Sequence, residues 1–343
     1  MRKLAKIVNL HTVEHHPNAD RLDIVKWDGW QCVVKRDEFK VGDLAIAFEI
    51  DSFLPTSIAP FLTKPGHFPK VFEGVEGERL RTVRLRGLLS QGLVLPLSIL
   101  SDTVCPVEGM DVTDVLGILK YERPMDAQLA GQARGIFPSF VRKTDQERCQ
   151  NLVREIQTAY DNGDEFEITM KLDGSSCTVI YLDNDIRVCS RNLDLKLDEV
   201  NSENTFIKTA NNTGLIVALQ AYGQNIAVQA ELMGPKIQDN REGLTSFMLY
   251  VFDIFDIDTQ KYLSPAKRME AFNALRALGA NIEHVPIIET STKLMSADIQ
   301  ILLNYAEGPS IVNKTREGLV YKRLDGGFSF KTISNQYLIQ SGN

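Results

Sequence analysis

The sequence lacks long hydrophobic runs and paired cysteines. No apolar stretch in its 343 residues approaches the roughly 20 residues that a membrane-spanning helix needs. Residues 1–6 lead into an alternating pattern rather than the apolar core of a signal peptide. The five cysteines are odd in number and form no Cys-x-x-Cys pair, so neither a disulfide framework nor a zinc site is indicated. We therefore expect a protein of a reducing compartment, cytoplasmic or nuclear, with no membrane partner.

Three common catalytic spacings are also missing. The sequence contains no Gly-x-x-x-x-Gly-Lys phosphate loop and no Gly-x-Gly-x-x-Gly after a strand, which excludes the usual signatures of P-loop and dinucleotide-binding proteins. It also has no Gly-x-Ser-x-Gly nucleophile elbow. Any nucleotide chemistry must therefore use a different arrangement of residues.

Basic residues are outnumbered, but unevenly along the chain. The formal net charge is −7, from 38 Lys and Arg against 45 Asp and Glu. Residues 1–124 hold 16 basic and 17 acidic residues, whereas the remainder holds 22 and 28. The overall acidity does not exclude a nucleic-acid partner, because phosphate contacts need only a local basic track.

The residue pattern divides the chain into two domains joined by a linker. Residues 1–124 read as short β-rich runs separated by turn signals, typical of a small β-barrel such as an OB fold. Residues 125–138 hold Gly131, Gly135 and Pro138, follow Pro124 and show little periodicity, which predicts a linker. Residues 139–343 show mixed helical and strand patterns. The fold class that we predict is α+β, with an N-terminal OB-fold barrel before an antiparallel-sheet domain.

Two segments of the second domain illustrate the pattern. Phe166, Ile168 and Met170 alternate with polar residues and predict a half-buried strand. Ser264 followed by a proline at the first helical position predicts a helix that ends at Gly279.

The candidate nucleophile is Lys171, in the run Lys171-Leu172-Asp173-Gly174 at the end of the predicted strand. An amine must be neutral to attack, so its pKa of ~10.4 has to fall through burial or a nearby cation. Glu231 and Glu317 are single acids in apolar strands, each followed by a glycine within three residues. Such carboxylates could hold a divalent metal ion.

Several such elements occur in a fixed order. Phe252 lies in an aromatic strand and could stack on a base, and Lys331 lies where it could pair with a phosphate. Together the elements resemble the motifs of covalent nucleotidyltransferases, which include ligases and mRNA-capping enzymes. They are residues 171–174, residues 190–192, Glu231, residues 252–254, residues 317–318 and Lys331.

An OB-like module before the transferase domain resembles RNA ligase family 5, the nick-sealing RNA ligases. DNA ligases and capping enzymes typically carry that module after the last motif, and here only 12 residues follow Lys331. The stretches 143–151 and 85–93 support the resemblance. In one departure, Ser329 stands where the superfamily often has a lysine, so Lys331 would contact the α-phosphate with help from Lys322.

The resemblance implies an ATP-dependent RNA ligase that acts through a lysyl-AMP intermediate on Lys171 and then an adenylylated 5′ end. Its cofactors would be ATP and magnesium or manganese, the metal held by Asp173, Glu231 and Glu317. Its partner would be RNA, as a nicked duplex or as RNA-containing ends, and the protein would be a monomer. The implied nucleotide-binding residues are Arg148, Gln150, Asp173, Gly174, Arg191, Glu231, Phe252, Glu317, Lys322 and Lys331.

Two alternatives remain at this point. The transferase motifs also occur in DNA ligases and in GTP-dependent capping enzymes. A non-enzymatic RNA-binding protein with a decayed transferase domain is the other possibility, although the joint presence of Lys171, Glu231, Glu317 and Lys331 argues against it.

The first domain carries the densest basic cluster, and no acidic residue occurs from residue 79 to residue 101. Such a cluster suits phosphate contacts with RNA. Because a regular strand alternates faces, the first two arginines cannot share a side with the last two unless a bulge intervenes. The candidate RNA-binding residues are Arg79, Arg81, Arg84 and Arg86.

Overall fold

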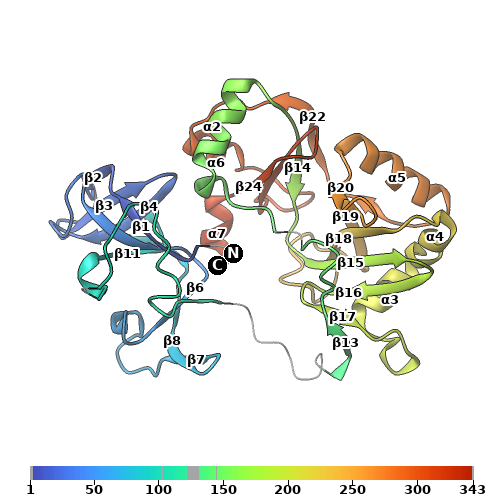
Figure 1. The fold of residues 1–343 in the computed structure, drawn as a ribbon, viewed down its shortest axis with the longest axis horizontal. Coiled ribbons are helices and arrows are strands. Elements are labelled where there is room, and N and C mark those ends of the chain that lie inside the picture. Colours follow the sequence, from blue (N-terminus) through green and yellow to red (C-terminus); the bar gives the residue numbers. More distant parts are fainter. Residues whose placement is uncertain (1–2, 102, 122–130, 144, 342–343) are drawn as a thin grey trace. The chain divides into compact units, whose positions relative to one another are not determined.

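The computed structural model describes residues 3–101, 103–121, 131–143 and 145–341. The chain forms two compact units, Met1–Pro124 with Leu338–Asn343, and Met125–Tyr337 (Figure 1). The sequence assigned the C-terminal residues to the second domain, whereas residues from Leu338 onward group with the first unit.

The first unit consists of short antiparallel strands around two apolar clusters. A tight hairpin places Trp27 opposite Trp30, and both are buried. One sheet has the order β1-β5-β11 and another the order β2-β3-β4. The strands are β1 Ala5–Asn9, β2 Thr12–His15, β3 Leu22–Trp27, β4 Trp30–Lys35, β5 Leu44–Phe48, β6 Ser52–Pro55, β7 Lys70–Phe72, β8 Val75–Arg79, β9 Thr82–Leu85, β10 Leu88–Gln91, β11 Leu93–Pro96 and β12 Leu119–Lys120. Two 3-10 turns, η1 Pro60–Leu62 and η2 Leu97–Ile99, complete the unit.

Part of the predicted linker is a strand. Residues 125–130 lie outside the described residues, but β13 (Ala133–Ile136) pairs with β17 (Leu193–Leu195) at the edge of a sheet. The prediction of a linker over 131–138 was wrong, because an edge strand tolerates Gly135 and the bulge that precedes it. The following Phe137 is buried in an apolar cluster.

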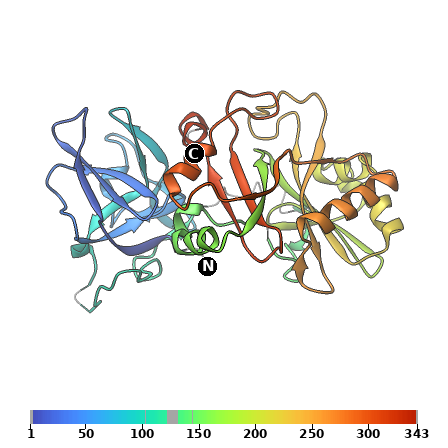
Figure 2. The same ribbon diagram turned by 90° about the horizontal axis from the view of Figure 1, so that it is seen from above.

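The larger sheet of the second unit has the order β13-β17-β16-β15-β18-β19-β20, with β21 parallel to β19. Three helices contribute to the apolar cluster against it and lie together over the sheet (Figure 2). These elements are β15 Ser175–Leu182, β16 Asp185–Cys189, β18 Ile226–Met233, β19 Met248–Asp256, β20 Lys261–Tyr262, β21 Glu283–His284, η4 Glu199–Asn201, α3 Thr205–Asn212, α4 Leu215–Tyr222 and α5 Pro265–Ala277. The α5 bounds confirm the helix predicted from Ser264 to Gly279.

The smaller sheet has the order β22-β14-β23-β24. Phe166 and Ile168 of its strand β14 pack with residues from two helices. The elements are η3 Cys149–Asn151, α2 Val153–Asn162, β14 Glu165–Lys171, β22 Ile287–Lys293, α6 Ile299–Tyr305, β23 Gly318–Arg323, β24 Ser329–Ile333 and α7 Asn335–Ser341.

Strand β14 differs from the predicted half-buried strand. Its polar residues Glu167 and Thr169 are as buried as its apolar residues. One face of β14 packs on the helices, and the other lies among the charged residues described below. The alternation of apolar and polar residues therefore reflects two buried faces rather than one buried and one solvent-exposed face.

Candidate active site

Lys171 is the last residue of β14, and its ammonium contacts Glu317, with 2.8 Å between Nζ and Oε1. The backbone of Lys171 lies directly opposite Gly318 in the β14–β23 pair. A Cβ atom at Gly318 would lie 2.1 Å from the carbonyl oxygen of Thr332. Glycine therefore permits the close strand packing beside which Glu317 reaches the lysine.

Glu231 of β18 approaches the loop that follows Lys171. Its Oε1 accepts a hydrogen bond of 3.0 Å from the backbone N–H of Gly174. A Cβ atom at Gly174 would lie 2.5 Å from the Leu232 carbonyl oxygen and 2.9 Å from Glu231 Cγ. The Lys-x-Asp-Gly run thus needs glycine at this point, and the contact joins the loop to the larger sheet.

The charges around Lys171 hold its proton. Burial would lower the pKa of Lys171, but the negative charges of Glu317, Glu231 and Asp173 outweigh it and raise the pKa above 10.5. Burial raises the pKa of Glu231 to about 7, with Lys171 opposing the shift. Burial and the charge of Glu317 also raise the pKa of Asp173, against the hydrogen bond from Tyr337. In this arrangement the lysine ammonium is the cation that the carboxylates share.

A divalent metal fits this donor set in its chemistry. Carboxylate oxygens are the ligands that magnesium and manganese prefer, and Glu317 Oε2 is buried without a hydrogen-bond partner among the described residues. However, the described part of the chain holds no group of three His, Cys, Asp or Glu side chains with metal-binding geometry. The expected set of Asp173, Glu231 and Glu317 is therefore not preformed, because Lys171 contacts Glu317 directly.

The strand register places the basic residues of the smaller sheet on one face. Lys322 lies opposite Glu167, and Lys331 lies opposite Val320, which in turn faces Thr169. Residues directly opposite share a face, as do residues two apart along a strand. Lys171, Glu167, Lys322 and Lys331 therefore all belong to the same face.

Arg148 and Gln150 come to the edge of this sheet. Arg148 forms a parallel bridge to Lys331, and the Lys331 N–H donates to the Glu147 carbonyl oxygen at 2.8 Å. Gln150 is 1% exposed, and its Nε2 has no hydrogen-bond partner among the described residues. The sequence placed both near the nucleotide, and the structure brings both beside β24.

Lys322 contacts the larger sheet rather than an open space. Its Nζ lies 2.9 Å from Asp253 Oδ2, donates to the Phe252 carbonyl oxygen and lies 6.0 Å from the Phe252 ring centre. A bulge in β19 lets Phe252 and Asp253 both meet Lys322. Burial lowers the pKa of Lys322, and Asp253 opposes the shift. The expected help to Lys331 at the α-phosphate is not available while Lys322 holds these partners.

Sequence reasoning missed a buried group behind Lys322. Glu167 forms an ion pair with Arg268 of α5, and Arg268 Nε donates to His284 Nε2 at 3.1 Å. Arg268 is fully buried, and Glu167 is 2% exposed. The only sign of this buried group in the sequence is Glu167, an acidic residue at one of the polar positions of the alternating β14 sequence. Tyr337, which hydrogen bonds to Asp173 and lies 4.8 Å below the Arg241 guanidinium, was also missed.

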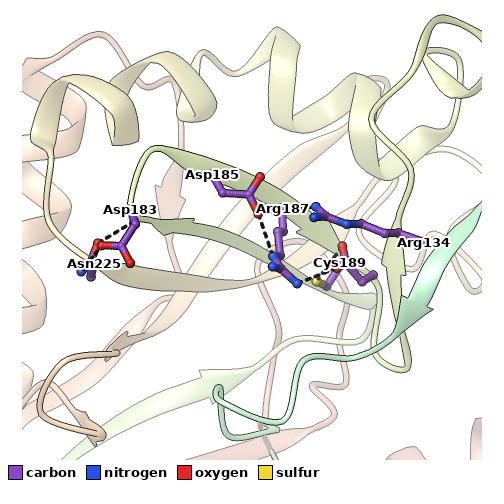
Figure 3. Close-up of polar contacts among 7 residues, drawn as sticks. Arg134, Asp183, Asp185, Arg187, Cys189 and Asn225 are labelled. Atoms are coloured by element: carbon purple, nitrogen blue, oxygen red, sulfur yellow. Dashed lines mark hydrogen bonds and ion pairs between the residues drawn. The ribbon is translucent and has the colours of Figure 1, made fainter.

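Arg191 is more exposed than the residues above. It forms an ion pair with Asp145 at 2.9 Å, and about half of each side chain is exposed. The preceding strand, β16, is anchored by Arg187, which contacts Asp185 at 3.1 Å and Asp194 at 3.2 Å (Figure 3). Arg191 lies in the connection between β16 and β17.

A surface pocket of about 650 Å³ lies at the other end of β15 and β18 from Glu231. Its lining includes Asp183 and Asn225, which hydrogen bond to each other (Figure 3). None of the residues predicted to bind the nucleotide lines it.

The four arginines predicted to bind RNA do not form one patch. Arg79 forms an ion pair with Asp51 at 2.6 Å and lies 4.9 Å from the Tyr121 ring centre. It therefore has a structural partner within the unit. Arg81, Arg84 and Arg86 are exposed on or next to the β9–β10 hairpin.

Comparison with known proteins identifies the family. Residues 4–97 match the family model of an OB-fold domain, and residues 164–333 match that of RNA ligases. The chain belongs to the RNA ligase family. The α+β fold, the OB-fold domain ahead of the ligase domain and the RNA ligase assignment are thereby confirmed.

Solved structures of the RNA ligase of Naegleria gruberi are similar over nearly the whole chain. A lysine-to-alanine mutant with ATP and Mn is 42% identical, with a TM-score of 0.88 and 98% of each chain covered. A glutamate-to-alanine mutant with AMP and Mn is 43% identical, with a TM-score of 0.89 and the same coverage. The ligase with PPi is 42% identical, with a TM-score of 0.88, also over 98% of each chain.

A search of curated proteins gave no match. No helix in the described ranges has the length and apolar character needed to cross a membrane.

Proposed function

We propose that this chain is an ATP-dependent RNA ligase whose nucleophile is Lys171. The observation that carries the proposal is the position of Lys171 at a rigid strand end, 2.8 Å from Glu317 and close to two further carboxylates. The similarity to a ligase solved with ATP and Mn supports the choice of nucleotide and metal.

The chemistry proceeds in three transfers. Neutral Lys171 attacks the α-phosphorus of ATP, so that a nitrogen–phosphorus bond forms, the bond to the β-phosphate oxygen breaks and pyrophosphate leaves. A 5′-phosphate of RNA then attacks the lysyl-AMP, which releases Lys171 and gives an adenylylated 5′ end. Finally a 3′-hydroxyl attacks that 5′-phosphorus, loses its proton and displaces AMP.

Asp173, Glu231 and Glu317 would hold magnesium or manganese together with phosphate oxygens of the nucleotide. Such a cation, when bound, neutralises the carboxylates and stabilises charge on the reacting phosphorus. Removing their negative charge removes the cause of the raised pKa of Lys171, so the amine can lose its proton. Glu317, which holds the ammonium in this structure, is the residue that must change partner.

The remaining residues receive roles from their positions. Lys331 would contact the α-phosphate from the same sheet face as Lys171, and Phe252 would stack on adenine. Lys322 would position Phe252 and Asp253 rather than contact phosphate. Arg191 would contact the ribose or the 5′-phosphate, Arg148 and Gln150 would lie by the outgoing phosphates, and the Gly174 backbone would lie against the nucleotide.

We propose that the substrate is RNA with adjoining 3′-hydroxyl and 5′-phosphate ends, chiefly nicks in duplexes, and that the enzyme acts as a monomer in RNA repair. The arginines of the first unit support an RNA backbone contact. Sealing rates on a nicked duplex and on open single strands of equal length distinguish the two substrate types.

The test of the nucleophile is transfer of labelled AMP to the protein. The wild type should become labelled by α-labelled ATP with manganese, and GTP should give no label. The Lys171→Met variant should lose the label entirely, because thioether sulfur cannot form the phosphoamide. Lys261→Met, at an exposed lysine of β20, is the control and should label normally. A labelled adduct that persists in Lys171→Met would refute the mechanism.

A further inference from the structure

The β9–β10 hairpin of the first unit has an unfavourable residue in its turn. Arg86 and Gly87 form the two-residue connection between Leu85 and Leu88, and both have positive φ, 48° and 93°. Two-residue hairpin turns of this kind strongly favour Asn-Gly, because asparagine tolerates the left-handed region. An arginine there is strained, because its Cβ atom disfavours the left-handed region. The chain therefore carries an arginine where a less strained residue would serve the turn.

A neighbouring loop holds this turn in place. The Asn18 N–H donates to His16 Nδ1 at 3.1 Å, so His16 carries its proton on Nε2 and donates to the Leu85 carbonyl oxygen at 3.2 Å. Asn18 Nδ2 donates to the Arg86 carbonyl oxygen, also at 3.2 Å. His16 is 4% exposed. Two side chains of one loop thus hold successive carbonyl groups at the tip of the hairpin.

The hairpin carries positive charge that no described residue of the unit neutralises. Arg84 and Arg86 are exposed, and neither side chain has an ion pair or hydrogen bond to another described residue. No acidic residue lies between residues 79 and 101. By contrast, Arg79 of the adjacent strand has its ion pair with Asp51. Val83 and Leu85, 43% and 39% exposed, accompany the charges.

We propose that the tip of the β9–β10 hairpin is an RNA-backbone contact, in which Arg84 and Arg86 bind phosphates and His16 and Asn18 are positioning residues. The proposal rests on the proposed RNA ligase function, because it takes RNA as the occupant. Unpaired guanidinium groups recognise phosphate oxygens, and the exposed apolar side chains suit sugar and base surfaces. A turn whose backbone is already held in place reduces the loss of backbone freedom on binding.

The first test is Arg86→Asn, which creates the turn sequence Asn-Gly. The variant should be at least as stable to heat as the wild type, because the left-handed strain is relieved. Its affinity for a nicked RNA duplex should fall about fivefold or more, and the slope of log affinity against log salt should fall by about 1. Lys40→Asn, at an exposed lysine of the same unit, is the control. It should change neither the affinity for the nicked duplex nor the salt slope.

Labelling by ATP separates this proposal from the proposed function. Arg86→Asn should accept AMP as fast as the wild type, because its change is confined to RNA binding. If the wild type is labelled but Arg86→Asn keeps full RNA affinity and salt slope, the hairpin is no RNA contact and is left as a surface for a protein partner. If the wild type is not labelled by ATP, the proposed function itself fails.

The second test concerns Asn18. Asn18→Ala should weaken RNA binding in the wild type but add no further loss in a chain that already carries Arg84→Ala and Arg86→Asn, because its effect passes through the two arginines. Equal losses in both backgrounds would refute the positioning role. Circular dichroism and thermal unfolding of each variant check that the fold is retained.

Discussion

At the scale of single residues, Glu231 is a carboxyl group whose ionisation opposes folding. Burial raises its pKa to about 7 from an ordinary 4.5. The folded state therefore binds this proton more tightly than the unfolded chain does. The resulting stabilisation is complete below pH 4.5 and is lost as the pH rises to about 7, by an amount on the order of 3 kcal/mol.

Replacing this carboxyl by an amide should flatten the pH dependence. Glu231→Gln keeps an oxygen that can accept from the Gly174 N–H but cannot ionise. Relative to the wild type, the variant should gain stability between pH 5 and pH 8. Urea unfolding of the metal-free protein at pH 5 and at pH 8 measures this change in the free energy of unfolding. Glu289→Gln, at an exposed residue of β22, is the control. An identical pH dependence in Glu231→Gln and wild type would show that Glu231 is ionised throughout.

At the scale of elements, charged residues join the two sheets of the second unit. Glu167 of β14 meets Arg268 of α5, and Lys322 of β23 meets Asp253 of β19. Glu167 and Lys322 are themselves opposite in the β14–β23 pair, so two acids and two bases form one buried, formally neutral group. His284 completes it as a neutral acceptor, since burial and the charge of Arg268 lower its pKa to about 4.

Removing one charge from this group should be strongly destabilising. Arg268→Met leaves the Glu167 carboxylate buried without its cation, which we expect to lower the free energy of unfolding by about 3–5 kcal/mol. Adding Glu167→Gln should restore part of the loss, because the uncompensated charge is then gone. Lys267→Met changes the exposed neighbouring residue of α5 and should have little effect. Denaturant unfolding of the four proteins decides, and equal destabilisation in the single and double variants would contradict this account.

Residues that belong to one strand could be predicted from the sequence, whereas contacts between distant elements could not. The sequence could predict Lys171, Glu231 and Glu317 as candidates because each lies in or beside an apolar strand and is followed within three residues by a glycine that the packing requires. Arg268 could not, because its partner Glu167 is 101 residues away and only the assembled sheets bring the two together. The contacts of Lys322 with Asp253 and Phe252 could not be predicted from the sequence for the same reason. The position of Lys322 in the sequence suggests a contact with the α-phosphate. In the structure the bulge at Phe252 brings Phe252 and Asp253 to Lys322 instead.

At the scale of the whole molecule, the two-domain order was predicted but its limits were not. Strand β13 looked like a linker because Ala133 and Gly135 carry little periodicity, and the pairing with β17 that makes it a strand is not local. The net charge of −7 does not describe the local charge, because Arg79 forms an ion pair within its unit while Arg84 and Arg86 have none with a described residue. The partners of each arginine therefore say more about a phosphate-binding surface than the net charge of the chain does.

The whole chain should also behave as a protein of five free thiols, of which one is accessible. Cys105 is exposed, whereas Cys32, Cys149, Cys177 and Cys189 are buried. Burial raises the pKa of Cys32 to about 11 and those of Cys149 and Cys177 to about 12, and it also raises that of Cys189. The thiolate is the reactive form of cysteine. A coloured aromatic disulfide reagent should therefore react with about one thiol per native protein and release about one equivalent of its coloured thiolate.

The same reagent should release five equivalents after denaturation, with or without prior reduction. Cys105→Ser should abolish the native signal and leave four in the denatured chain, which identifies the accessible thiol. Release of three or fewer equivalents from unreduced, denatured protein would reveal a disulfide and would contradict the expectation of a reducing compartment. Several fast equivalents from the native wild type would instead mean that the interior opens, since thiols with such raised pKa values react only when exposed to solvent.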